Sequence, residues 1–278
     1  MLELFNTVSE NCSRIVAEKY SSSFYSAIRL LHKDMKAPVY NIYGFVRFAD
    51  EIVDTFHEFD KDGLLRQFKN ATYEAIEDRI SLNPILNSFQ LTVNEYKIDR
   101  HLIDAFFRSM ELDLSKKKYN REEYGEYIYG SAEAVGLMCL YVFTKGDKNL
   151  YRQLERQAKA LGAAFQKVNF LRDLKEDNNE LSRMYFPGCD FSNFLEKDKK
   201  QIEDDIENDF RVAYGGILKL PSRARFGVYV AYKYYYSLFK KIKRMHPCLI
   251  LQRRVRIPDH HKLMILARAG VKHQLKLI

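Results

Sequence analysis

The chain has 278 residues, with 45 Lys and Arg against 37 Asp and Glu, a formal net charge of +8 and 46% hydrophobic residues. This length provides a sizeable core for one large domain or two small ones, and the hydrophobic content excludes an intrinsically disordered chain. The 12 glycines and 6 prolines are about half the average share, which argues against turn-rich sandwiches and barrels.

The cysteines and the N-terminal residues bear on where the protein works. The four cysteines lie far apart without a C-x-x-C pair, so we expect reduced thiols and a cytoplasmic location. Near the N-terminus, Glu3 and Glu10 interrupt the sequence and no apolar stretch typical of a signal peptide follows. The seven histidines show no H-x-x-x-H spacing, which gives no support for zinc, and no glycine-rich nucleotide-binding motif is present.

Apolar residues recur at helical spacing along nearly the whole chain, as in Ile103, Phe106, Phe107 and Met110. No linker or shift in composition divides the sequence. We therefore predict an all-α fold, with a single domain over residues 1–278 and roughly ten helices. Helices are expected to begin or end at Pro38, Asn83-Pro84, Gly146-Asp147, Pro187-Gly188, Pro221 and Pro258.

The first acidic pair lies on a predicted helix from Tyr43 to beyond Asp54. At about 100° per residue, one stripe carries Tyr43, Arg47, Asp50 and Asp54. Two carboxylates at i and i+4 can share Mg²⁺, which prefers oxygen ligands and often bridges carboxylates to a substrate phosphate. A lone pair of this kind is more often an exposed acidic face. The opposite side of the helix carries Phe45, Ala49, Ile52 and Phe56.

The most apolar stretch runs from Ala134 to Thr144, between Glu133 and Lys145. It is shorter than the roughly 20 residues that a membrane-spanning helix needs. We therefore predict a helix of the core.

The second acidic pair follows on a predicted helix from Leu161 to Asp177. Glycine and two amides precede the acids on one stripe, which favours the wall of a cavity over a solvated face. Burying carboxylates from two such helices without cations would be costly, so metal and phosphate are the natural compensation. The stripe comprises Gly162, Gln166, Asn169, Asp173 and Asp177, and the opposite side carries Leu161, Phe165 and Val168.

A third acidic run, from Glu203 to Asp209, also contains the D-x-x-x-D spacing. Here Ile202, Ile206 and Phe210 form an ordinary buried stripe. We therefore expect the acids of this run, Asp205 and Asp209 included, to face solvent.

The positive charge gathers at the C-terminal end. From Lys240 to Ile278 there are eleven Lys and Arg against one acid, Asp259, and no nucleic-acid-binding module is recognisable. The segment from Val255 to Leu277 combines basic and apolar residues as an interfacial helix does, so peripheral contact with an anionic membrane is one expectation. Packing of the apolar residues on the core is the alternative.

These motifs resemble those of the squalene/phytoene synthase family over nearly the whole chain. One departure is Glu133, which stands where the family's V-A-G-x-V-G motif has a small residue, so the chain length of the substrate stays open. The matching segments are Lys19–Phe24, Arg47–Asp54, Tyr127–Gly136, Ala164–Asp177 and Arg183–Pro187.

The resemblance implies an isoprenoid-synthase helical bundle around a central cavity, with the acidic motifs on opposing helices. It implies the head-to-head condensation of two prenyl diphosphates through a cyclopropyl diphosphate, followed by a second ionisation, rearrangement and proton loss. Mg²⁺, with Mn²⁺ as a substitute, would help the diphosphate leave. The implied catalytic and metal-binding residues are Asp50, Asp54, Asp173 and Asp177, with Asn169 as a further metal ligand.

The resemblance also implies a set of substrate contacts. Arginine suits this role because a planar guanidinium grips phosphate oxygens bidentately, while the alternative for each arginine is a nearby acid such as Glu51 or Glu176. The weaker candidates are Arg183, Tyr185 and Arg254. The main candidates are Tyr20, Ser21, Ser22, Ser23, Phe24, Tyr43, Arg47, Gln166, Arg172 and Tyr236.

Within the family, the form of the second motif is more similar to phytoene synthases, which join two geranylgeranyl diphosphates (C20) without NADPH. The first alternative is a squalene or dehydrosqualene synthase that uses farnesyl diphosphate (C15), the former with NADPH. A non-catalytic binding or assembly module on the same fold is a further alternative, although it predicts eroded aspartates.

Overall fold

The structure is a computed structural model that describes residues 1–179, 184–189, 194–275 and 277–278, and of residues 176–179 it describes the main chain alone. Most of the described residues are helical. No strand occurs among them, and their β-structure is limited to an isolated bridge between Lys118 and Met184. The all-α prediction is confirmed. The described part of the chain has more helices than the roughly ten expected, because several are short.

The helices follow one another with short connections. They are α1 (Leu2–Tyr20), α2 (Ser22–Ile28), α3 (Lys33–Asp54), α4 (Lys61–Asp78), α5 (Pro84–Tyr96), α6 (Arg100–Ser115), α7 (Arg121–Ile128), the π-helix η1 (Tyr129–Glu133), α8 (Ala134–Thr144), α9 (Lys148–Asn179), α10 (Glu196–Ile217), α11 (Ser222–Lys243), α12 (Pro247–Gln252) and α13 (Asp259–Gln274).

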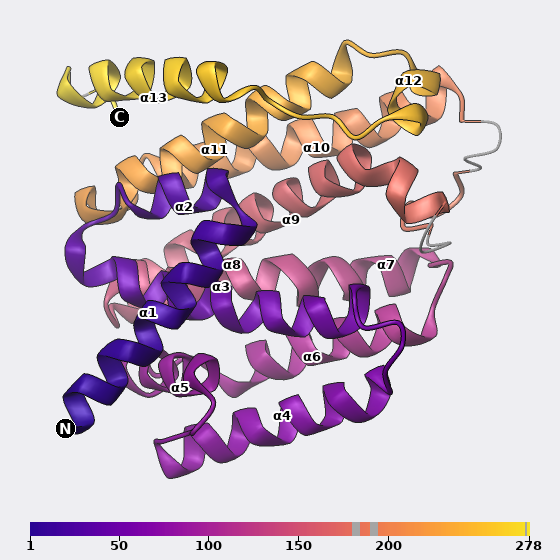
Figure 1. The fold of residues 1–278 in the computed structure, drawn as a ribbon. Coiled ribbons are helices and arrows are strands. Elements are labelled where there is room, and N and C mark those ends of the chain that lie inside the picture. The colour runs from indigo at the N-terminus through magenta and orange to yellow at the C-terminus, as the bar shows by residue number, and fades with distance from the viewer. Residues whose placement is uncertain (180–183, 190–193, 276) are drawn as a thin grey trace.

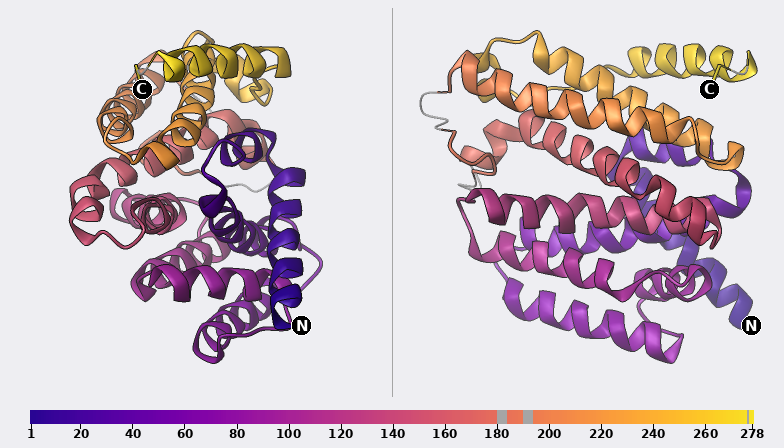
Figure 2. Two further views of the ribbon diagram at one scale, coloured as in Figure 1. Left: turned by 90° about the vertical axis from the view of Figure 1, so that its left-hand side faces the viewer. Right: turned by 180° about the vertical axis from the view of Figure 1, so that it is seen from behind.

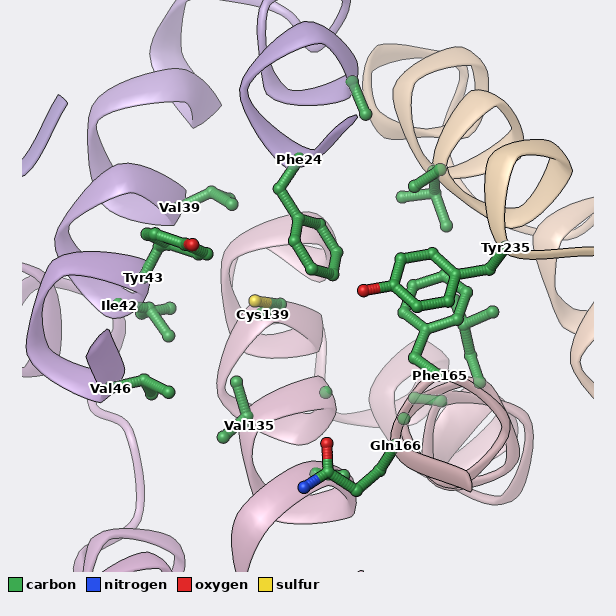
Figure 3. Close-up of a pocket in the computed structure, with 18 of the residues that line it drawn as sticks. Phe24, Val39, Ile42, Tyr43, Val46, Val135, Cys139, Phe165, Gln166 and Tyr235 are labelled. Carbon is green, nitrogen blue, oxygen red and sulfur yellow. The ribbon is translucent and has the colours of Figure 1, made fainter. Parts of the chain in front are cut away.

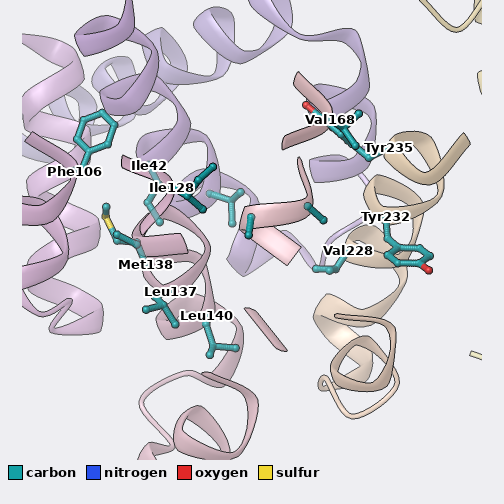
Figure 4. Close-up of a cluster of buried hydrophobic side chains, with 14 of the residues drawn as sticks. Ile42, Phe106, Ile128, Leu137, Met138, Leu140, Val168, Val228, Tyr232 and Tyr235 are labelled. Carbon is teal, nitrogen blue, oxygen red and sulfur yellow. The ribbon is translucent and has the colours of Figure 1, made fainter. Parts of the chain in front are cut away.

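The long helices stack as layers of roughly parallel and antiparallel rods. Helix α4 forms one edge of the stack, α3, α6, α8 and α9 form its middle, and α13 forms the opposite edge above α11 (Figures 1 and 2). Buried side chains from all of these layers form one apolar core, part of which is shown in Figure 4. The two acidic motifs lie on α3 and α9, so the fold positions them on different rods of the same stack.

Helix α3 differs from the sequence prediction at both ends. Pro38 lies inside the helix and does not break it, because it falls in the second turn, where the missing N–H removes one early hydrogen bond. The helix ends at Asp54, which leaves Phe56 beyond it with an exposed ring. The apolar side is otherwise as expected, since Phe45 is fully buried and stacks on Phe89 with ring centroids 3.9 Å apart.

Helices α7, η1 and α8 form one continuous rod through the middle of the bundle. The bounds of α8 match the core helix predicted from Ala134 to Thr144, and Met138 on it is fully buried. Among the described residues, Arg121–Thr144 is one stretch of 24 residues that is long and apolar enough to span a membrane by length and composition alone. The rod packs against α6 and α9, and Gly130 makes this possible, since a Cβ there would lie 2.2 Å from the Ala105 carbonyl oxygen.

The acidic run on α10 does not face solvent throughout, which corrects the sequence prediction. Lys167 of α9 donates hydrogen bonds to Asp205 (2.5 Å) and Asp209 (2.7 Å), and the Asp209 side chain is only 15% exposed. Glu203 is buried beside the fully buried Lys199, at 2.6 Å. The acids are buried because lysines pair with them, and helical periodicity alone does not reveal such partners.

Candidate active site

A cavity of about 420 Å³ lies in the middle of the bundle, within the usual range for small-molecule sites. Side chains from α2, α3, α8, α9 and α11 point into it (Figure 3). Helix α8 packs against both α3 and α9, so it separates the two helices that carry the acidic motifs and forms the wall between them. Asp50 of the first motif and Gln166 and Asn169 of the second line this one cavity.

The cavity is polar at one end and apolar at the other. On α9, the lining residues run from Leu154 to Asn169 and Arg172, and at 1.5 Å per residue Leu154 and Asn169 lie about 22 Å apart along the axis. On α3, the lining runs from Val39 to Asp50. The charged lining residues of α3 (Arg47 and Asp50) and of α9 (Arg172) therefore lie at the same end of an elongated, largely apolar cavity.

Asp50 is the acid of α3 that lines the cavity. Its half-buried carboxyl loses hydration and lies near Asp54, and these two effects raise its pKa to about 8 against the opposing effect of Arg47. A carboxylate in this position needs a cation to stay ionised at neutral pH.

On α9, the amide of Asn169 and the carboxylate of Asp173 differ in their partners. Asn169 Nδ2 donates to Gln166 Oε1 (3.3 Å), while Asn169 Oδ1 is buried without a hydrogen-bond partner. Asp173 accepts from Nε of Arg172 (2.9 and 3.0 Å) and from Nε of Arg254 (3.0 Å). The side chain of Asp177 lies outside the described residues.

The polar end fits a Mg²⁺–diphosphate group. Asp50 and the orphaned Asn169 oxygen are hard oxygen donors on two walls of one cavity, and Mg²⁺ is commonly held by one or two carboxylates together with substrate phosphates. Among the side chains that the structure describes, no group of three or more His, Cys, Asp and Glu could hold a metal by itself. The phosphate oxygens would therefore complete the coordination.

Two arginines of the polar end are arranged differently. Arg47 donates to Glu51, the alternative partner expected from the sequence, and its guanidinium lies 4.5 Å above the ring of Tyr20. Its Nε is buried and without a hydrogen-bond partner, so one donor is left for a ligand. Arg172 pairs with Asp173, and the neighbouring charges raise its pKa despite burial.

Four aromatic rings from four helices line the middle of the cavity, and all four are labelled in Figure 3. Phe165 and Tyr235 stack with centroids 4.0 Å apart, and Phe24 lies 5.4 Å from Tyr235 and 6.0 Å from Tyr43. Burial raises the pKa of both tyrosines, which keeps their phenols neutral. Ring faces of this kind stabilise cations in apolar surroundings.

The sequence model of the squalene/phytoene synthase family matches residues 17–261. The chain belongs to the squalene/phytoene synthase family. The family's members are prenyltransferases, and the chain is an enzyme of this kind. The identification agrees with the cavity, since prenyl diphosphates combine an apolar chain with an anionic head.

The relatives include enzymes named for different products. The chain is 26% identical to a phytoene synthase of Arthrospira platensis, over 95% of this chain and 92% of the relative. It is 24% identical to a 4,4'-diapophytoene synthase of Staphylococcus haemolyticus, over 73% and 70% of the two chains. A dehydrosqualene synthase crystal structure shares the fold with a TM-score of 0.82, at 20% identity and 98% coverage of both chains.

In this family member, three of the predicted substrate-contacting residues do not line the cavity. Tyr236 packs on Phe210 on the other side of α11, and its neighbour Tyr235 lines the cavity in its place. Gly227, Ala231 and Tyr235 follow one another at i+4 spacing and all line the cavity, so this spacing was the pattern in the sequence that could have pointed to Tyr235. Ser22 is exposed and accepts a hydrogen bond from Lys262, and Ser23 is likewise absent from the lining.

The other predicted contacts lie at the cavity, and Arg254, a weaker candidate, joins them. Ser21 caps α2 by accepting from the Phe24 amide. Asp54 and Asp173 do not line the cavity themselves: Asp54 lies one helical turn after the lining residue Asp50, and Asp173 directly follows the lining residue Arg172. Arg183 lies outside the described residues. The predicted lining residues are Tyr20, Ser21, Phe24, Tyr43, Arg47, Asp50, Gln166, Asn169, Arg172 and Arg254.

A buried carboxylate near Asp50 escaped the sequence analysis. Asp113 of α6 accepts hydrogen bonds from the hydroxyls of Tyr119 (2.7 Å), Tyr127 (2.7 Å) and Tyr185 (3.1 Å). Tyr185, a weaker substrate candidate, is thus held in this cluster and does not line the cavity. The cluster ties the segment that follows α9 to α6 and α7, which positions the surroundings of the second acidic motif.

Glu133, the departure from the family motif, lies at the end of η1 and does not line the cavity. Burial raises the pKa of its carboxyl, and Lys159 opposes that effect. The side chain therefore occupies the α9 side of the rod, while its neighbours Ser131 and Ala132 line the cavity. The Glu133 side chain therefore does not narrow the cavity.

The raised pKa of Asp50 predicts a pH-dependent stability. Between about pH 4 and pH 8 the folded state holds a proton that the unfolded state releases, so the free energy of unfolding falls as pH rises, by several kcal/mol in all. Thermal melts across this range are expected to show the decline, and Asp50→Asn is expected to reduce it. Equal slopes in both proteins would contradict the assignment.

Proposed function

We propose that this prenyltransferase joins two geranylgeranyl diphosphates head to head to give phytoene, through a cyclopropyl diphosphate and without NADPH. One observation carries the proposal: an elongated apolar, aromatic-lined cavity ends at Asp50 and the orphaned oxygen of Asn169. The phytoene synthase relative supports the C20 substrate. The acids Asp50, Asp54, Asp173 and Asp177, with Asn169, are the proposed ligands of Mg²⁺.

The polar end would bind and orient the diphosphate. Mg²⁺, when bound there, supplies positive charge that stabilises the departing diphosphate. Arg47 has a free buried Nε, and Arg172 and Arg254 can exchange Asp173 for phosphate oxygens. The apolar walls would exclude water from the allylic cation, and Phe24, Phe165 and Tyr235 would stabilise its charge through their ring faces.

Product analysis tests the proposal. The purified protein with Mg²⁺ is incubated with C15 or C20 diphosphate, with and without NADPH, and the hydrocarbons are identified by mass spectrometry. We expect phytoene from the C20 substrate, unchanged by NADPH. Squalene or dehydrosqualene as the main product would favour farnesyl diphosphate, the alternative suggested by the diapophytoene synthase relative. No hydrocarbon from either substrate would favour a non-catalytic module.

The apolar end of the cavity predicts a chain-length variant. Phe143 lies in the last turn of α8 and lines the cavity, as Leu154 does near the start of α9. Phe143→Ala is expected to shift the kcat/KM ratio between longer and shorter diphosphates about 10-fold towards the longer. Phe59→Ala, at an exposed ring, is the control. An unchanged ratio would place the floor of the chamber elsewhere.

A further inference from the structure

Helix α13 presents an apolar stripe to solvent. Ile265 and Ala269 are buried on its inner face, and the helix packs on α11. At i+4 spacing, the outer face carries residues whose exposed fractions are unusually high for apolar side chains: Leu263 at 67%, Val271 at 55% and Leu275 at 64%. The apolar residues of this segment thus pack on the core on one side only, and the stripe is unpartnered on the other.

A basic flank borders the stripe. At about 100° per residue, Arg268 and Lys272 follow Leu275 around the helix, and both are exposed. Lys272 and Lys240 lie close enough to Lys233 to lower its pKa, with burial as the larger cause. Cationic side chains of α11 therefore extend the flank beyond α13.

The surroundings hold little opposing charge. In the sequence from Ser222 to Ile278, Asp259 is the sole acidic residue, and Lys262 forms a 3.1 Å ion pair with it. Rings of Tyr232 and Tyr236 lie beneath Lys233, 5.4 and 5.8 Å from its Nζ. An apolar stripe beside a basic flank is the combination found on helices that lie at lipid–water interfaces.

We propose that the outer face of α13, made of Leu263, Met264, Val271, Leu275, Arg268 and Lys272, docks the protein on an anionic lipid bilayer. Helix α13 forms an outer edge of the molecule, so nothing among the described helices shields it from a flat surface (Figures 1 and 2). The apolar side chains enter the interface while the flank neutralises anionic headgroups. A second copy of the chain would bring the same positive flank, whereas an anionic membrane complements it.

The docked face adjoins the walls of the cavity. Helix α13 packs on α11, which carries Tyr235, and Lys262 donates a 2.7 Å hydrogen bond to Ser22 of α2, which carries Phe24. Docking therefore brings two walls of the cavity near the lipid. The proposal itself rests on the surface of α13 and is independent of the reaction catalysed.

Vesicle flotation tests the docking surface. The full chain is mixed with vesicles of phosphatidylcholine alone or with phosphatidylglycerol. We expect binding that needs phosphatidylglycerol and weakens with salt. Arg268→Gln with Lys272→Gln is expected to weaken it about 25-fold, at about five-fold per charge. Leu263→Ser with Val271→Ser is expected to weaken it at least about 10-fold.

Matched variants and a size measurement separate the other outcomes. Arg66→Gln with Arg152→Gln removes two exposed charges elsewhere, and Ile80→Ser with Leu82→Ser removes two exposed apolar side chains, so both are expected to bind as the wild type. Circular dichroism checks that each variant folds. Equal flotation with both lipids, or equal loss in the matched variants, would overturn the proposal. So would a dimer that Leu263→Ser with Val271→Ser dissociates in a protein that binds no vesicles.

Discussion

Asp50→Asn is expected to lower kcat by about 10²–10³-fold or more while the protein stays folded. The amide keeps the shape of the side chain but removes the charge of the one α3 acid that lines the cavity, and losing one group that stabilises transition-state charge has an effect of this size. At neutral pH the variant is also expected to melt at a higher temperature than the wild type, because it lacks a poorly hydrated carboxyl with a raised pKa. Steady-state kinetics and thermal melts measure both effects.

The control for this variant is Asp204→Asn. Asp204 is 57% exposed and pairs with Lys200 on the surface of α10, so its replacement is expected to change neither activity nor melting temperature appreciably. If Asp50→Asn retained activity within a few-fold of the wild type, the polar end of the cavity would not be where the diphosphate leaves.

Asp113→Leu is expected to lower the free energy of unfolding by about 4 kcal/mol, which corresponds to roughly 10 °C in melting temperature. The replacement leaves three buried tyrosine hydroxyls without their common acceptor. It also releases Tyr185 and with it the segment that follows α9. Denaturant unfolding followed by circular dichroism gives the value.

The chain offers a matched control on the same helix. Asp104 of α6 accepts a hydrogen bond from Tyr73 at the exposed end of that side chain, so Asp104→Asn is expected to cost less than about 1 kcal/mol. A loss of stability no larger in Asp113→Leu than in Asp104→Asn would show that the tyrosine cluster does not support the fold.

The sequence predicts the helices and the faces of α3 and α9 well, because these depend on local periodicity. Phe45 and Val168 are buried, while Asp50 and Asn169 line one cavity as the stripes require. The start of α3 was harder to predict. Pro38 lies within the helix and does not begin it, because the first turns of a helix tolerate proline better than its interior does.

Long-range partners were beyond the reach of the sequence. Asp209 is paired with Lys167 of another helix, and Asp113 gathers tyrosines from segments up to 72 residues away. No periodicity encodes such pairs, because they depend on how the helices meet. The one-residue error between Tyr236 and Tyr235 has the same origin, since one step on a helix turns a side chain by about 100°.

The central claim is that α3 and α9 jointly hold a metal–diphosphate group at the polar end of the cavity. A crystal structure with Mn²⁺ and a non-hydrolysable prenyl diphosphate tests it most directly. The account predicts anomalous density for Mn²⁺ within coordination distance of both Asp50 and Asn169 Oδ1, with the prenyl chain running towards Phe143. Mn²⁺ and diphosphate bound elsewhere, with the oxygens of Asp50 and Asn169 left uncoordinated, would contradict it.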